Sequence, residues 1–182
     1  MRIISGIYKG RRFTPPASLK ARPTTDFAKE GLFNVLANEI DIEEAQVLDL
    51  FAGSGSISFE FVSRGVGHTT SIEQSFQHGA FIKKTAQELN IKTLSVLKAD
   101  VFRYIETCNH SYDIIFADPP YSLPQLAEIP NKIMNSALLK PDGLFILEHG
   151  KNNNFGEHPN FINTSYYGNV HSSFFNTTTT QT

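Results

Sequence analysis

Residues 114 to 121, IIFADPPY, end an apolar, strand-like run on a carboxylate, two prolines and a tyrosine. Proline fixes φ and lacks a backbone N–H, so no adjacent donor competes for the Asp118 carboxylate or the Pro119 carbonyl. Two fixed acceptors suit an exocyclic base amine, whose N–H bonds must be drawn toward tetrahedral geometry before nitrogen acts as a nucleophile. The Tyr121 ring could stack on a flipped-out base. The competing interpretation is a proline-stiffened turn that only ends a strand.

A second chemical pattern lies in DLFAGSGSI, residues 49 to 57. Asp49 ends an apolar run, and the turn that follows contains Phe51, Gly53, Ser54 and Gly55. Glycines let the backbone approach a ligand closely and direct a helix N-terminus toward it. Position 58 is serine and no lysine follows, so neither the dinucleotide fingerprint nor the phosphate-binding P-loop is matched. A ligand with an adenosine but no pyrophosphate fits better.

Two further carboxylates follow the next two strand-like runs. Glu73 lies about 20 residues beyond the glycines, where an acid typically binds ribose hydroxyls. Asp100 follows the third run and could accept from the exocyclic amine of adenine. Taken singly, the glycine turn could be only a turn, Glu73 a surface acid and Asp100 a helix cap. Their succession after three strands favours S-adenosylmethionine as the ligand.

The elements that must position these residues alternate along the chain. Apolar runs predict strands at 47–51, 69–73, 93–99, 112–118 and 143–149, and helical spacing predicts helices at 56–65, 81–90, 101–108 and 131–139. This alternation predicts an α/β fold with a mostly parallel sheet and helices on both faces. Residues 161–175 predict an antiparallel hairpin that turns near Gly168. A further helix begins after Thr24 or Thr25, either of which could cap it, with an apolar face at Ala28, Leu32, Val35 and Leu36.

Positive charge is concentrated at the N-terminus. The chain has 182 residues and a net charge of -2, yet residues 1–25 hold six basic residues and no acid. We expect residues 1–23 to form a basic hairpin or arm, residues 24–175 the main domain and residues 176–182 a disordered tail. Lys9, Arg11 and Arg12 predict a polyanion-binding edge that contacts RNA rather than the cofactor, the alternative being a solvated hairpin. With no apolar run of roughly 20 residues and no signal peptide, a cytoplasmic protein is expected.

Several stretches together resemble a known family. DPPY resembles the [DNS]-P-P-[YFW] motif of Rossmann-like methyltransferases that modify base amines. With RIISGIYKGRRF, RPTTDFAKEGLFNVL, DLFAGSGSISFEFVSRG and IEQ in the same order, residues 1 to 150 resemble the RsmD family of 16S ribosomal RNA guanine-N2 methyltransferases. The resemblance implies a Rossmann-like domain with a seven-stranded sheet, S-adenosylmethionine as methyl donor and a guanine of small-subunit RNA as target. We further expect a monomer that acts on 16S ribosomal RNA within the small subunit or an assembly intermediate, with no metal and no membrane.

The resemblance also implies roles for single residues. Gly53, Ser54 and Gly55 would cradle the methionine part of the cofactor, Glu73 would bind ribose and Asp100 would face adenine. The target site would consist of Asp118, Pro119 and Tyr121, and the R-P-T-T stretch, Arg22, Thr24 and Thr25, would lie near cofactor and substrate. Ser75 stands where the family often has a second acid.

Two other functions remain open from the sequence. A DNA adenine-N6 methyltransferase also uses DPPY but usually needs a separate domain that reads bases in the groove. A non-catalytic RNA-binding assembly factor could have kept the fold. The intact glycine loop and DPPY argue against the latter.

Overall fold

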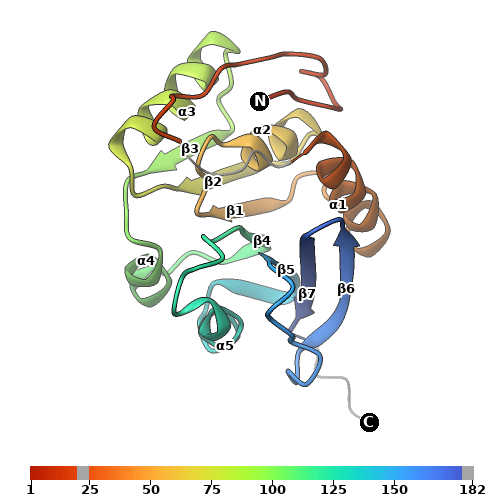
Figure 1. Ribbon diagram of the computed structural model, residues 1–182. Helices are drawn as coiled ribbons and strands as arrows, with labels where there is room; N and C mark the ends of the chain where they lie inside the picture. Colours follow the sequence, from red (N-terminus) through yellow and green to blue (C-terminus); the bar gives the residue numbers. More distant parts are fainter. Residues whose placement is uncertain (20–24, 178–182) are drawn as a thin grey trace.

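The computed structural model describes residues 1–19 and 25–177, which fold around one seven-stranded sheet (Figure 1). The strand order is β3-β2-β1-β4-β5-β7-β6. Neighbours among β1 to β5 run parallel, whereas β7 is antiparallel to both β5 and β6. The predicted α/β fold with a C-terminal antiparallel hairpin is confirmed. The strands are β1 (Gln46–Leu50), β2 (His68–Ile72), β3 (Leu94–Leu97), β4 (Tyr112–Ala117), β5 (Leu139–His149), β6 (Phe161–Tyr167) and β7 (Val170–Asn176).

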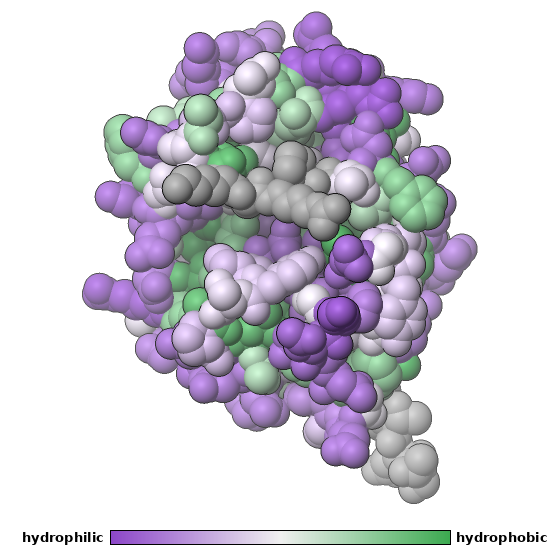
Figure 2. Space-filling model, viewed as in Figure 1, coloured by the Kyte–Doolittle hydropathy of each residue, from purple (hydrophilic) through white to green (hydrophobic). Residues whose placement is uncertain are grey.

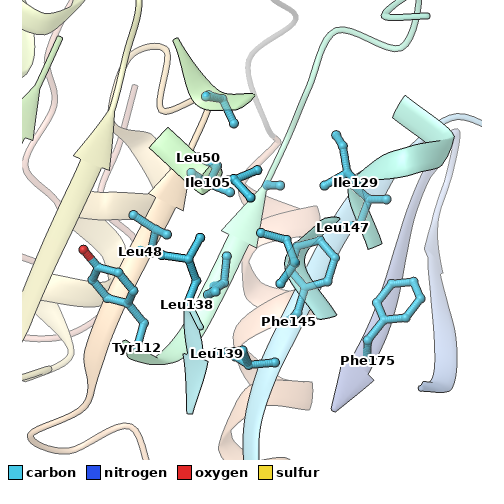
Figure 3. Close-up of a cluster of buried hydrophobic side chains, with 14 of the residues drawn as sticks. Leu48, Leu50, Ile105, Tyr112, Ile129, Leu138, Leu139, Phe145, Leu147 and Phe175 are labelled. Carbon is cyan, nitrogen blue, oxygen red and sulfur yellow. The ribbon is translucent and has the colours of Figure 1, made fainter. Parts of the chain in front are cut away.

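Helices cover both faces of the sheet. They are α1 (Asp26–Glu39), α2 (Ser56–Ser63), α3 (Phe76–Glu88), α4 (Val101–Thr107) and α5 (Ile129–Met134), with a short 3₁₀ turn at Leu126–Glu128. Ile115, Phe145 and Leu147 pack with α4 and α5 on one face (Figure 3). Phe116 and Ile146, at alternate positions of the same strands, pack with α1 and α2 on the other face. Because successive strand side chains point to opposite faces, the face of every residue at a strand end is fixed.

Two predicted elements differ from the observed ones. The helix predicted at 131–139 is wrong, because α5 ends at Met134 and Leu139 already begins β5. Ser136 explains the early end: its hydroxyl donates to the Ile133 carbonyl at 2.7 Å and accepts from the Leu138 N–H at 3.2 Å. The helix predicted at 81–90 instead begins at Phe76, where the Ser75 side chain caps it.

Helix α1 begins as its sequence predicts. The Thr25 hydroxyl accepts from the Ala28 N–H at 3.1 Å, which caps the helix. Ala28, Leu32 and Leu36 are buried against the sheet as expected. The same face also buries Lys29, whose ammonium donates to the carbonyl of Arg2 and lies 3.8 Å from the Glu60 carboxylate.

The N-terminal segment, residues 1–19, is bound along α2. A single antiparallel bridge between Arg2 and Arg12 closes its hairpin, in agreement with the sequence. The buried Glu60 carboxylate accepts the backbone N–H groups of Ile4 and Ser5, each at 3.0 Å. Ser63 adds two further acceptors, its carbonyl for Ile7 and its hydroxyl for Tyr8. The segment is therefore held against α2 by these four hydrogen bonds.

Among the helices in the described part of the chain, none is both long and apolar enough to span a membrane.

Candidate active site

A cavity of about 940 Å³ lies beyond the carboxyl ends of β1 and β4. Ligands of open parallel sheets bind at this edge. Three parts of the chain line the cavity: the glycine loop from Asp49 to Ile57, the start of α1 at Thr25 and Asp26, and the N-terminal segment. Asp118, the first residue after β4, also lines it. The cavity therefore joins the glycine loop to the DPPY motif.

The two glycines of the loop have different roles. Both have positive φ, +57° at Gly53 and +73° at Gly55, which favours glycine. A Cβ on Gly53 would meet no atom closer than 3.8 Å, so this residue leaves open space at the cavity wall. A Cβ on Gly55 would come within 3.0 Å of Ile82, in α3. Gly53 therefore borders the cavity, whereas Gly55 lets the loop pack against α3.

Glu73 holds the glycine loop in place. One carboxylate oxygen accepts the N–H of Gly53 at 2.7 Å, and the other accepts the N–H of Ser75 at 2.7 Å. His78 lies 3.6 Å away through Nδ1. The donor at position 75 is the backbone N–H, so it does not depend on the side chain, whereas the Ser75 hydroxyl caps α3. Glu73 does not line the cavity described above, so the structure assigns it a supporting contact with the loop.

Asp100 caps a helix. It is exposed at the N-terminus of α4 and its carboxylate accepts from the Arg103 N–H at 3.0 Å. It shares the sheet edge with Glu73 but lies outside the cavity lining. A contact between Asp100 and adenine stays a prediction. Of the predicted R-P-T-T residues, Thr25 lines the cavity, whereas Arg22 and Thr24 lie outside the described residues.

Two acids that line the cavity lie close enough to affect each other. Asp49 is buried and accepts from the Ser58 hydroxyl, which is also 2.6 Å from the Ser71 hydroxyl. Burial, with a smaller contribution from the nearby charge of Asp118, raises the pKa of Asp49 to about 7, although the hydrogen bond from Ser58 lowers it in part. Burial likewise raises the pKa of Asp118 to about 6. Such a wall favours a ligand that brings positive charge or N–H donors.

The rest of the DPPY motif extends from Asp118 toward β5. Pro119 is buried, and Tyr121 is 44% exposed. A Cβ on Gly150 would lie 3.1 Å from the Tyr121 ring, so the ring lies over the residue that follows β5. The motif thus places an acid at the cavity, whereas Pro119 and Tyr121 are not among the residues that line it.

Sequence reasoning missed part of the cavity wall. Arg12 to Ala17 and Leu19 line it, so the expectation that the basic segment contacts RNA and stays apart from the cofactor site is incomplete. Lys9 and Arg11 are exposed as expected, and Figure 2 shows hydrophilic side chains gathered at the top of the view, where the N-terminal segment and α3 lie. Two prolines at positions 15 and 16, which stiffen the chain, were the available signal.

Known proteins resemble the chain over most of its length. The family model described as Conserved hypothetical protein 95 matches residues 1–176. The ribosomal RNA small subunit methyltransferase D of Buchnera aphidicola subsp. Baizongia pistaciae is 36% identical to this chain. The match covers 81% of this chain and 75% of the relative. The protein of that name from Escherichia coli K12 is 33% identical, over 81% of this chain and 74% of its own.

A solved structure has the same fold over nearly the whole chain. The Escherichia coli protein yhhF superposes with a TM-score of 0.84 at 28% identity, and the match covers 96% of each chain. Because the family model spans both the N-terminal segment and the C-terminal hairpin, the chain belongs to the Conserved hypothetical protein 95 family, the RsmD family that its motifs resemble.

Proposed function

We propose that the protein transfers a methyl group from S-adenosylmethionine to the exocyclic N2 of a guanine in the 16S ribosomal RNA of the small subunit. The observation that carries the proposal is that Asp118 borders the same cavity as Gly53 and Ser54. A methyl donor on the glycine loop and an amine at DPPY would then be neighbours. The names of the Buchnera and Escherichia coli relatives support a small-subunit ribosomal RNA as substrate.

The residues at the cavity fit S-adenosylmethionine. The acids Asp49 and Asp118 suit its positive sulfonium and amino groups, and the open side of Gly53 admits a ligand close to the backbone. Phe51, Ser54 and Thr25 complete the wall that would hold the cofactor. When bound, the cofactor supplies an electrophilic methyl group. Glu73 contributes by holding the Gly53 N–H and therefore the shape of the loop.

The chain's own residues would prepare the amine. The Asp118 carboxylate and the Pro119 carbonyl each accept one N–H bond, which turns the nitrogen lone pair toward the cofactor side of the cavity. Tyr121 stacks on the flipped base and fixes its plane. Asp118 then holds or passes on the proton that the methylated amine loses.

The exposed basic residues would bind the RNA backbone. Lys9 and Arg11 lie on the segment that Glu60 and Ser63 fix to α2, so their charges have a constant position relative to the cavity. We further propose that the protein acts as a cytoplasmic monomer on the small subunit or an assembly intermediate. The described residues form one fold without a separate base-reading domain, so a preformed RNA surface would have to present the guanine.

The test is methylation of small ribosomal subunits, and of RNA extracted from them, taken from cells that lack this protein. With S-adenosylmethionine, mass mapping should find one new methyl group on a guanine N2 with the wild type and none with Asp118→Ala. Methylation of DNA adenines instead would support the alternative DNA methyltransferase. Binding of RNA with no methyl transfer to either nucleic acid would indicate the non-catalytic assembly factor.

A further inference from the structure

A row of polar side chains crosses three adjacent strands beside the cavity. Ala117 pairs with Leu147 in the parallel ladder, so the next residues, Asp118 and Glu148, are cross-strand neighbours. Glu148 in turn pairs with Ser172 of β7. All three follow the alternation of Phe116, Ile146 and Phe174, and so they lie on the face covered by α1 and α2. We call Asp118, Glu148 and Ser172 the polar row.

Glu148 is buried, and one of its two carboxyl oxygens lacks a hydrogen-bond partner of good geometry among the described residues. Glu148 is 2% exposed, and the oxygen without such a partner is Oε1. The hydroxyl of Ser172, a residue with 0% exposure, also lacks a hydrogen bond of good geometry, although it lies close enough to Glu148 to act on the pKa of that acid. Nearly all buried polar atoms are hydrogen-bonded, so an unpaired one requires an explanation. Beside a ligand site, one such explanation is a contact that forms only in a particular protonation or ligand state.

The surroundings of Glu148 favour its neutral form. The charged groups that act on it are Asp118 after β4 and Asp49 in β1, both acids, and β7 contributes the neutral Ser172. No cation in the described part of the chain compensates them. Two neighbouring carboxylates removed from water do not both ionise. Burial and, to a smaller extent, the charge of Asp118 therefore raise the pKa of Glu148 well above its usual value, although the contact with Ser172 lowers it in part.

We propose that Glu148 is a positioning residue for Asp118: as a neutral carboxylic acid it donates its O–H to one oxygen of the Asp118 carboxylate, leaving the other oxygen for the N–H of the target amine. The inference rests on the proposed function and adds a residue to it. A hydrogen bond from a neutral acid to a carboxylate is strong and directional, so it would fix the orientation of Asp118 while keeping its charge. Above a pH of about 6 the pair would hold one proton between them.

The proposal makes a prediction about alkaline pH. When Glu148 finally ionises, Asp118 loses its donor and gains a neighbouring negative charge. The single-turnover methylation rate should then fall on the alkaline side. A glutamine at position 148 keeps an N–H donor of similar shape but cannot ionise, so its rate should lack this alkaline decline.

The test compares single-turnover rates of the wild type, Glu148→Gln and Glu148→Ala from pH 6 to pH 10 (roughly the span of the proposed titration), with cofactor affinity measured alongside. Glu148→Gln should stay within about threefold of wild type near neutrality and lose the alkaline decline. Glu148→Ala should be about tenfold slower, as expected for one lost charge-assisted hydrogen bond. Both should bind S-adenosylmethionine normally. Thr69→Val is the matched control, since Thr69 is another buried hydroxyl without a partner among the described residues, in β2 away from the polar row.

Two results would overturn the role of Glu148: a Gln variant as slow as the Ala variant, or a Gln variant that keeps the wild-type alkaline decline. Infrared spectroscopy of the wild type with isotope-labelled glutamate tests the same point without a mutation. A protonated glutamate should be present at neutral pH, and its absence would contradict the proposal. If the wild type methylates no RNA, the proposed function is overturned instead. The infrared result would still decide the protonation state of Glu148.

Discussion

The backbone N–H of Gly53 donates a 2.7 Å hydrogen bond to the carboxylate of Glu73, so the acid after β2 holds the loop after β1. This contact joins two strand ends that are neighbours in the sheet. A ribose contact was the role expected for Glu73, and its support of the loop is an additional one. The conformation of the glycine loop therefore depends on Glu73, whether or not Glu73 also binds the ribose.

Replacement of Glu73 by alanine should weaken S-adenosylmethionine binding at least about tenfold, because charged hydrogen bonds are worth roughly 1.5 to 3 kcal/mol each. Calorimetry measures the effect, and RNA binding should survive. Glu88→Ala is a suitable control, since Glu88 is an exposed acid of α3 that lies 3.9 Å from Lys84. Unchanged cofactor affinity in Glu73→Ala would remove the residue from the site.

Arg11 and Arg12 are adjacent in sequence but should affect different ligands. Arg11 is exposed outside the cavity lining, whereas Arg12 lines the cavity. Arg11→Ala should reduce the salt dependence of RNA binding by about one unit of slope and leave cofactor affinity unchanged. Arg12→Ala should change cofactor affinity as well. Filter binding across salt concentrations and calorimetry separate the two, and identical effects of both variants would contradict this division.

Cofactor binding should depend on pH through the acidic wall. The pKa of Asp49 is raised to about 7 and that of Asp118 to about 6, so both become negative as pH rises through this window. S-adenosylmethionine carries a positive sulfonium that its demethylated product lacks. The affinity for the cofactor should therefore rise between about pH 5 and 8. The rise is up to about tenfold for each unit by which cofactor binding lowers the pKa of one of these acids. The affinity for S-adenosylhomocysteine should change less; equal pH profiles would refute the acidic wall as the cause.

Stability should show the opposite trend with pH. A buried acid whose folded pKa is raised binds its proton more tightly in the folded state, so its contribution is full at low pH and is lost as pH rises. For Asp49 the window runs from 3.8 to about 7. Denaturant unfolding of the ligand-free protein should thus lose stability across it, and Asp49→Asn should flatten this dependence. A steeper dependence in Asp49→Asn would show that the sign is wrong.

Local sequence patterns predicted the polar residues at the strand ends well, because each group of them is contiguous in the sequence. The glycine loop, Glu73 and DPPY each follow an apolar run, and the structure brings them to one edge of the sheet. The hydrogen bonds that hold the N-terminal segment on α2 were not predictable, because Glu60 is 56 and 55 residues away in sequence from Ile4 and Ser5.

Other features were hidden by their local context. Glu148 lies in the apolar run GLFILEH and looks like the polar end of a buried strand. Only the register of β4 and β5 makes it a neighbour of Asp118. The helix predicted at 131–139 failed for a related reason, because its spacing is helical but the Ser136 hydroxyl ends the helix by bonding to its own backbone neighbours.

The most direct test of the account is the single-turnover methylation rate of Asp118→Ala on small-subunit RNA, with cofactor affinity measured in parallel. Because Asp118 would contact the amine whose geometry changes at the transition state, the rate at saturating S-adenosylmethionine should fall by about 10² or more. Cofactor affinity should fall much less, by no more than the roughly tenfold that the charge of Asp118 contributes to binding. Asp118→Asn should keep partial activity, since an amide oxygen still accepts the N–H, and full inactivity would indicate that Asp118 acts as a base. Methylation by Asp118→Ala at the wild-type rate would contradict the account and leave DPPY as a proline-stiffened turn.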